Sequence, residues 1–129
     1  MVIDTSALVA IFLNEPEREV FMNLILLDTK RLFSAVSLVE AAIVLETRQG
    51  ETVSRELDLF LHEAGIEIVS VDSAQAEQAR LAYRRYGKGR HRANLNLGDC
   101  FTHALAVVSG EPVLAKGPEF QLANLSTCR

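Results

Sequence analysis

Cysteine is scarce in this chain of 129 residues, which contains only Cys100 and Cys128. Cys100 falls inside a helical pattern and Cys128 stands next to the C-terminus, so no Cys-x-x-Cys pair is available for zinc binding or dithiol redox chemistry. We expect both side chains to be reduced thiols.

Long hydrophobic runs are also missing, although apolar residues make up 49% of the sequence. The longest, such as residues 6–13 and 104–108, are well short of the ~20 residues that a membrane-spanning helix needs. The chain reaches Asp4 without the basic leader and apolar run of a signal peptide. With 23% charged residues, the composition predicts one globular domain over residues 1–129, which we expect to be cytoplasmic.

Basic residues are outnumbered, 13 against 17 acidic, and the formal net charge of −4 argues on average against a nucleic-acid partner. Their distribution reverses that impression. Residues 80–92 hold six basic residues and no acidic one, so this segment carries +6 and the rest of the chain −10. We call residues 80–92 the basic segment, and it makes the chain electrostatically polarised.

Strand-like and helix-like patterns alternate along the chain. Short apolar strands are expected at 2–3, 32–33, 66–71 and 113–115, and helices at 7–13, 16–27, 41–48, 51–64, 73–86 and 99–108. This alternation predicts an α/β fold with right-handed crossovers, a mainly parallel central sheet and helices on both faces. Val20, Leu24 and Leu27 are the expected buried face of the second helix.

Four acids stand at the expected sheet edge or one turn beyond it: Asp4, Glu40, Asp99 and Glu119. Each also has an ordinary structural explanation. Asp4 can cap a helix, Glu40 completes a Ser-x-x-Glu capping box with Ser37, Asp99 suits a first turn, and Glu119 follows a Gly-Pro turn. Ligands of open parallel sheets bind outside the carboxyl ends of the strands, so these acids are expected to converge there.

Converging carboxylates repel one another unless a cation lies among them. Oxygen ligands without thiolate or clustered imidazole favour Mg²⁺ or Mn²⁺, and the matching chemistry is phosphodiester hydrolysis. Asp4 and Asp99 are the expected metal ligands, with Glu40 in support.

Three segments carry a family resemblance: MVIDTSALVAIFLNEPE at 1–17, SAVSLVEAAIVLETR at 34–48 and AYRRYGKGRHRANLNLGDCFTHALA at 82–106. They resemble the VapC toxins of bacterial toxin–antitoxin pairs, which are PIN-domain ribonucleases, and the LNLGDCF run at 95–101 is the most specific part. The resemblance implies a PIN fold, Mg²⁺-dependent endoribonuclease activity, a homodimer and neutralisation by a VapB-type antitoxin.

The resemblance also assigns residues. The family's catalytic acids fall on Asp4, Glu40, Asp99 and Glu119, and its supporting hydroxyl on Thr5 or Ser6. The chain departs from the family pattern at three places: Glu119 replaces a commoner Asp, His103 a frequent Tyr, and Ala123-Asn124 a frequent Thr-Asp.

Within the basic segment, residues Arg84, Arg85, Lys88, Arg90 and Arg92 are expected to contact RNA phosphates, because this stretch directly precedes the Asp99 helix. A merely solvated helix face is the alternative. Tyr83 and Tyr86 could stack on bases, although half-buried packing is the commoner role of such tyrosines. His103, one turn after Asp99, could form a hydrogen bond with the Asp99 carboxylate or simply be a core residue.

Two other functions remain open on sequence grounds. Receiver domains also place acids and a lysine at strand ends, and Lys116 and Asp72 would take those positions, but the adjacent acid pair of a receiver is missing because Thr5-Ser6 follows Asp4. A degenerate PIN domain that binds RNA or its antitoxin without cutting is the second alternative.

Overall fold

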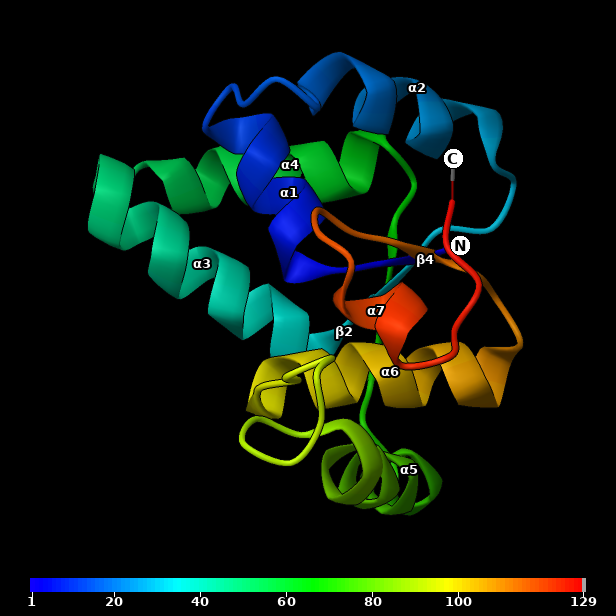
Figure 1. The fold of residues 1–129 in the computed structure, drawn as a ribbon. Helices are drawn as coiled ribbons and strands as arrows, with labels where there is room; N and C mark the ends of the chain where they lie inside the picture. Colours follow the sequence, from blue (N-terminus) through cyan, green and yellow to red (C-terminus); the bar gives the residue numbers. More distant parts are fainter. Residues whose placement is uncertain (129) are drawn as a thin grey trace.

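The computed structural model describes residues 1–128, and its centre is a four-stranded sheet in the order β3-β2-β1-β4 (Figure 1). Every neighbouring pair of strands is parallel. The strands are β1 (Val2–Ile3), β2 (Leu32–Ser34), β3 (Glu67–Val69) and β4 (Val113–Leu114). The predicted parallel sheet is confirmed, and the third strand is shorter than the expected 66–71.

Seven helices connect and cover these strands. They are α1 (Thr5–Phe12), α2 (Arg18–Leu27), α3 (Ala35–Gln49), α4 (Val53–Glu63), α5 (Ser73–Tyr86), α6 (Leu97–Ser109) and α7 (Glu119–Leu122). In Figure 1, α1 to α4 lie on one side of the sheet and α5 and α6 on the other, as predicted for an α/β fold. None of the helices within residues 1–128 is long and apolar enough to cross a membrane.

The alternation of side chains along the strands divides the core into two layers. Ile3 and Leu114, paired across β1 and β4, join the cluster under α1 to α4, whereas their neighbours Val2 and Val113 join a second cluster that includes Leu105 of α6. Each of these strand residues is fully buried. Strands buried on both faces need continuous apolar residues, and β1 and β4 supply them, whereas the edge strand β3 is largely exposed.

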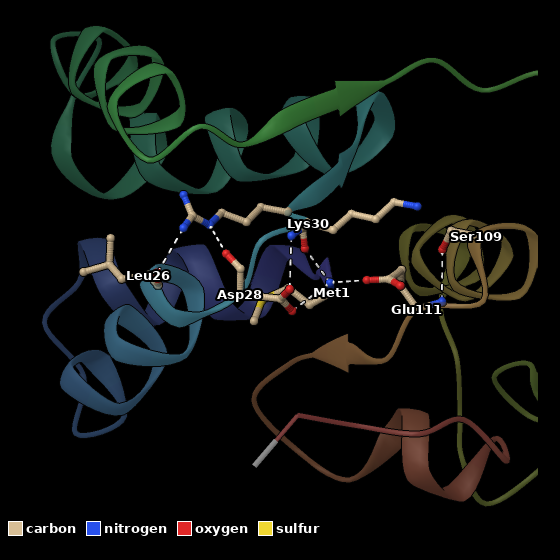
Figure 2. Close-up of polar contacts among 7 residues, drawn as sticks. Met1, Leu26, Asp28, Lys30, Ser109 and Glu111 are labelled. Carbon is tan, nitrogen blue, oxygen red and sulfur yellow. Dashed lines mark hydrogen bonds and ion pairs between the residues drawn. The ribbon is translucent and has the colours of Figure 1, made fainter.

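The start of β1 is fixed by its amino group, as Figure 2 shows. The Met1 ammonium donates to Asp28 Oδ2 (3.0 Å), to the Lys30 carbonyl (2.6 Å) and to Glu111 Oε1 (2.7 Å). These contacts join β1 to the loop before β2 and to the turn before β4. The hydrogen bond from the Lys30 amide, together with the ammonium, lowers the pKa of Asp28.

The predicted capping box of Ser37 and Glu40 is wrong. Helix α3 begins directly after β2, with Ser34 as its N-cap accepting from the Val36 amide (3.2 Å). Ser37 therefore lies one turn inside the helix, and Glu40 in its second turn caps nothing. A capping box does occur at the start of α6, between Asn96 and Asp99.

The predicted buried face of α2 is wrong for two of its three residues, since only Leu24 packs against the core. Phe21 and Ile25 are buried, whereas Val20 and Leu27 are 57% and 82% exposed. Residues 20–27 are apolar on nearly every side of the helix, so hydrophobic periodicity could not select the face that packs against α1.

Candidate active site

Asp4 follows β1 at the carboxyl edge of the sheet and is the N-cap of α1. Its carboxylate is buried, with only 4% of the residue exposed. The Ser6 amide donates to Oδ2 (3.0 Å) and the Thr102 hydroxyl donates to Oδ1 (2.7 Å). Both donors are neutral, so the buried negative charge is hydrogen-bonded but not cancelled.

Thr102 of α6 belongs to a short chain of hydroxyl groups. Its Oγ1 lies 3.3 Å from Ser37 Oγ, and both residues are fully buried. Because an ionised carboxylate only accepts, the single proton of Thr102 goes to Asp4, and Ser37 must therefore donate to Thr102. Sequence reasoning missed Thr102; its position three residues after Asp99, on the same helix, was the available clue.

Glu40 is the acid contributed by α3. The Thr5 hydroxyl donates to its Oε1 over 3.0 Å. Burial raises the pKa of Glu40, the Thr5 bond opposes that rise, and the nearby charge of Asp4 adds to it. Since Glu40 has no capping role, its position beside Asp4 has no local folding explanation.

Gly98 makes the position of Glu40 possible. A Cβ on Gly98 would lie only 1.9 to 2.2 Å from the three carboxyl atoms of Glu40. The Glu40 carboxyl group therefore rests directly on the first turn of α6, where any larger residue would displace it. This residue too was missed from the sequence, because a glycine in a first turn is not informative by itself.

Asp99 lies at the start of α6 and joins the acids together electrostatically. Its Oδ2 accepts from the Asn96 amide (3.0 Å), and the Asn96 side chain accepts from the Asp99 amide (2.8 Å). Burial raises the pKa of Asp99 to about 6 against the lowering effect of the Asn96 bond, and the charges of Asp4, Glu119 and Glu40 contribute to the rise. The other three predicted acids thus all act on Asp99.

Glu119 lies in the first turn of α7 and acts electrostatically on Asp99. A Cβ on Gly117 would lie 2.4 Å from Glu119 Oε2, and Gly117 has a positive φ of 99°, so glycine is needed there on both counts. Ser6 fixes the neighbouring backbone, because its Oγ accepts from the Lys116 amide (3.0 Å). Thr5 and Ser6 therefore both support the site, one through Glu40 and the other through the end of β4.

The donor chemistry of these acids fits a hard divalent cation. All four acids present carboxylate oxygens, and none of them is in an ion pair with a side chain of residues 1–128. The acids are not already arranged as a complete set of ligands, since no three His, Cys, Asp or Glu side chains of the described chain form a metal-binding group. Burial is the main cause of the raised pKa of Asp99, and repulsion from the other acids adds to it; a bound cation would relieve this repulsion.

Comparison with known proteins shows the family to which the chain belongs. The PIN domain family model matches residues 1–124. A Ribonuclease VapC of Mycolicibacterium smegmatis is 57% identical over 126 residues, which cover 98% of each chain. Ribonuclease VapC30 of Mycobacterium tuberculosis is 54% identical over 98% of this chain and 97% of its own. The chain belongs to the VapC family of PIN-domain proteins.

The fold is also found in a solved VapC structure. The crystal structure of Mycobacterium tuberculosis VapC20, described as a toxin that cleaves the sarcin-ricin loop, superposes with a TM-score of 0.81 over 99% of this chain and 98% of that one. At 18% identity the likeness concerns the fold alone. It confirms the PIN fold predicted from the sequence.

The basic segment of this VapC protein is exposed beside the acids. Its five predicted RNA contacts lie on the last turn of α5 and on the loop that leads into α6, and all are exposed: Arg84, Arg85, Lys88, Arg90 and Arg92. None of the five forms an ion pair within residues 1–128, whereas Arg80 pairs with Glu77 (2.8 Å). Their charge is therefore available to a ligand.

His103 is a core residue in the structure. It is buried, its Nε2 lies 3.3 Å from the Ala123 carbonyl, and its ring packs against that of Tyr86 at 5.6 Å. Burial lowers its pKa, so the ring is neutral. Tyr86 is half-buried, and its hydroxyl oxygen accepts a hydrogen bond from the Asn124 side-chain amide (3.0 Å). Both observations agree with the packing role expected for it.

The residues of the receiver hypothesis have other partners. Lys116 Nζ lies 3.3 Å from carboxylate oxygens of both Glu15 and Glu17, and these contacts raise its pKa. Asp72 is the N-cap of α5 and accepts from the Gln75 amide (2.9 Å). Neither residue joins the acid site, so this alternative has no structural support.

The contact between Gly98 and Glu40 gives a first prediction. Gly98→Ala should reduce RNA cleavage by about 10- to 100-fold, the range typical of disturbed supporting groups, because the new Cβ displaces the Glu40 carboxyl. Stability should hold or rise, since alanine is favoured over glycine in a helix by up to about 1 kcal/mol. The double variant with Glu40→Gln should be no slower than Glu40→Gln alone; additive losses would show that Gly98 acts elsewhere.

The bond from Thr102 to Asp4 gives a second prediction. Thr102→Val keeps the shape of the side chain but removes the donor, so Mn²⁺ affinity measured by calorimetry should fall about 10- to 100-fold. Thr102→Ser keeps a hydroxyl and should restore most of the affinity. Equal affinity of the Val variant and the parent would contradict a positioning role.

The raised pKa of Asp99 predicts a pH-dependent stability. An acid whose pKa is raised by folding destabilises the native state when it ionises, so this cost develops as pH rises from about 4 to 6 and persists above. Asp99→Asn should therefore be more stable than the parent at pH 8 and show no such gain at pH 4, in thermal unfolding with EDTA. Asp58→Asn, at an exposed position on α4, is the control for net charge.

Proposed function

We propose that this protein is a VapC-type toxin acting as a metal-dependent endoribonuclease, with Asp4, Glu40, Asp99 and Glu119 as its catalytic acids. The observation that carries the proposal is the convergence of four unpaired carboxylates from different elements: burial raises the pKa of Asp99 to about 6, and the charges of the other three acids contribute to that rise. Such a cluster is costly to assemble and is typical of a functional site.

Asp4 and Asp99 would hold the cation, Mg²⁺ or Mn²⁺. When bound, the cation supplies an acidified water and neutralises charge that develops on the phosphoryl oxygens. Glu40 would orient the cation or the water around it, and Thr5 would fix Glu40 through its 3.0 Å bond. Thr102 would hold the Asp4 carboxylate in its orientation toward the cation through their hydrogen bond. Glu119 would add its carboxylate to the site from α7.

The substrate would be held by the basic segment. Its exposed and unpaired charges, Arg84, Arg85, Lys88, Arg90 and Arg92, suit phosphates of an RNA strand that crosses the start of α6. Hydrolysis would leave a 5′-phosphate and a 3′-hydroxyl. Because cellular RNA is the substrate, the protein would act in the cytoplasm.

Two protein partners complete the proposal. A VapB-type antitoxin would neutralise the toxin, and an arginine from it could enter the acid cluster in competition with the cation. A homodimer would cover apolar side chains that α3 leaves exposed, namely Val39 (58%), Ile43 (58%) and Val44 (37%).

The decisive variant is Asp4→Asn. Cleavage of RNA in Mg²⁺ or Mn²⁺ should fall by more than about 100-fold, beyond the usual effect of supporting residues, because a charged ligand is lost. The fold should survive, since asparagine also accepts the bond from the Ser6 amide. Toxicity on expression should disappear in parallel, and mapping of the cleaved ends in total RNA would identify the target.

The matched control is Asp72→Asn, which changes the N-cap of α5 in the same way but far from the acids. It should cleave RNA like the parent. Parent protein that binds RNA yet does not cut it with either cation would favour the degenerate, non-catalytic alternative. Equal cleavage by Asp4→Asn and the parent would refute the assignment of the site.

A further inference from the structure

A cavity of about 430 Å³ opens between α5 and the start of α6. Ala76 and Ala79 line it on the α5 side, and Leu97, Cys100 and Phe101 line it on the α6 side. The two small alanines leave the space that larger residues of α5 would fill. Its volume is in the range of small-molecule binding sites.

The cavity is apolar inside and cationic around its opening. Arg80, Arg84 and Arg90 line it as well, together with Tyr83. Arg80 is already paired with Glu77, whereas Arg84 and Arg90 are in no ion pair within the described chain. Burial raises the pKa of Cys100 to about 11, so its thiol is neutral.

Tyr83 supplies a flat surface at this opening. It is 39% exposed, and the guanidinium carbon of Arg90 lies 5.7 Å from the centroid of its ring. Gly87 allows the ring to lie close to the backbone, because a Cβ there would stand 2.8 Å from a ring carbon. Aromatic rings and guanidinium planes are the surfaces on which proteins stack unpaired RNA bases.

The cavity adjoins the acids through the first turn of α6. Leu97, which is 72% exposed, and Cys100 line the cavity, and the two residues between them are Gly98 and Asp99 of the acid site. A ligand that places one group in the cavity would therefore have the rest of its own chain next to the carboxylates.

We propose that this cavity is a nucleobase subsite that takes one unpaired base of the RNA beside the phosphate to be cut. A nucleotide combines an apolar flat base with an anionic phosphate, which matches an apolar cavity with free arginines at its opening. The subsite rests on the proposed function, because it selects the substrate of the same acids. Tyr83 is then a specificity residue of the RNA site, and the packing role expected for it from the sequence does not describe it.

The test separates the bases from the phosphates. In EDTA, which prevents cleavage, fluorescein-labelled octamers of A, C, G and U are compared by anisotropy with an abasic ribose-phosphate chain of equal length and charge. The parent should bind its best octamer at least about tenfold more tightly than the abasic chain, since one stacked base contributes roughly that factor or more. Tyr83→Leu should lose most of this preference and keep its affinity for the abasic chain, whereas Tyr83→Phe should keep both.

Arg84→Gln is the control for charge. It should weaken the binding of every octamer and of the abasic chain alike. It should also reduce the slope of log affinity against log salt concentration by about one. Equal binding of octamers and abasic chain by the parent would overturn the subsite, as would an equal loss of both in Tyr83→Leu. A change of oligomeric state in Tyr83→Leu, measured by sedimentation, would show instead that a second copy of the chain covers the cavity and would also overturn it.

The experiment distinguishes a failure of the subsite from a failure of the proposed function. If the parent cleaves RNA in Mg²⁺ but shows no preference for bases, the subsite fails and the ribonuclease stands. If base-dependent binding is found but neither cation supports cleavage, the subsite stands and the catalytic assignment fails.

Discussion

Repulsion among partly buried carboxylates is the constraint around which this site is built. Four acids from different elements come close enough that three of them add to the rise in the pKa of Asp99, which burial chiefly causes and which reaches about 6. Every side-chain or amide group seen to support them is a neutral donor: the Thr102 and Thr5 hydroxyls and the Ser6 and Asn96 amides. Neutral donors orient the acids without cancelling their charge, so the repulsion is left for a cation to relieve.

The roles of the acids in folding and in function can be told apart. Asp4 caps α1 and Asp99 completes the capping box of α6, so their positions would be understandable in a protein without activity. Glu40 caps nothing, is partly buried beside Asp4, and requires a glycine at position 98 to fit. A buried acid without a folding role raises the free energy of the native state, and Glu40 is therefore the most informative of the four.

The sequence predicted the features that depend on local patterns. The alternation of strands and helices yielded the parallel sheet, and the end of β1 correctly located Asp4 at its edge. The start of α3 was mistaken because Ser37 and Glu40 matched a capping box, whereas Ser34, three residues earlier, was the true cap. Gly98 and Thr102 were missed for a different reason: each matters only through a contact with a residue more than 50 positions away, which no local pattern records.

Helix α6 explains why these distant contacts are consistent with one another. Its first two turns provide Leu97 to the cavity, Gly98 to Glu40, Asp99 to the acid cluster and Thr102 to Asp4. Because a helix is rigid over this length, a shift in any one of these contacts moves the others with it. The loop that carries part of the basic segment leads into this helix. One element of the fold therefore fixes the position of the charges available to RNA relative to the acids available to a cation. A chain with a net charge of −4 can thus present a cationic surface to a polyanion next to its own cluster of acids.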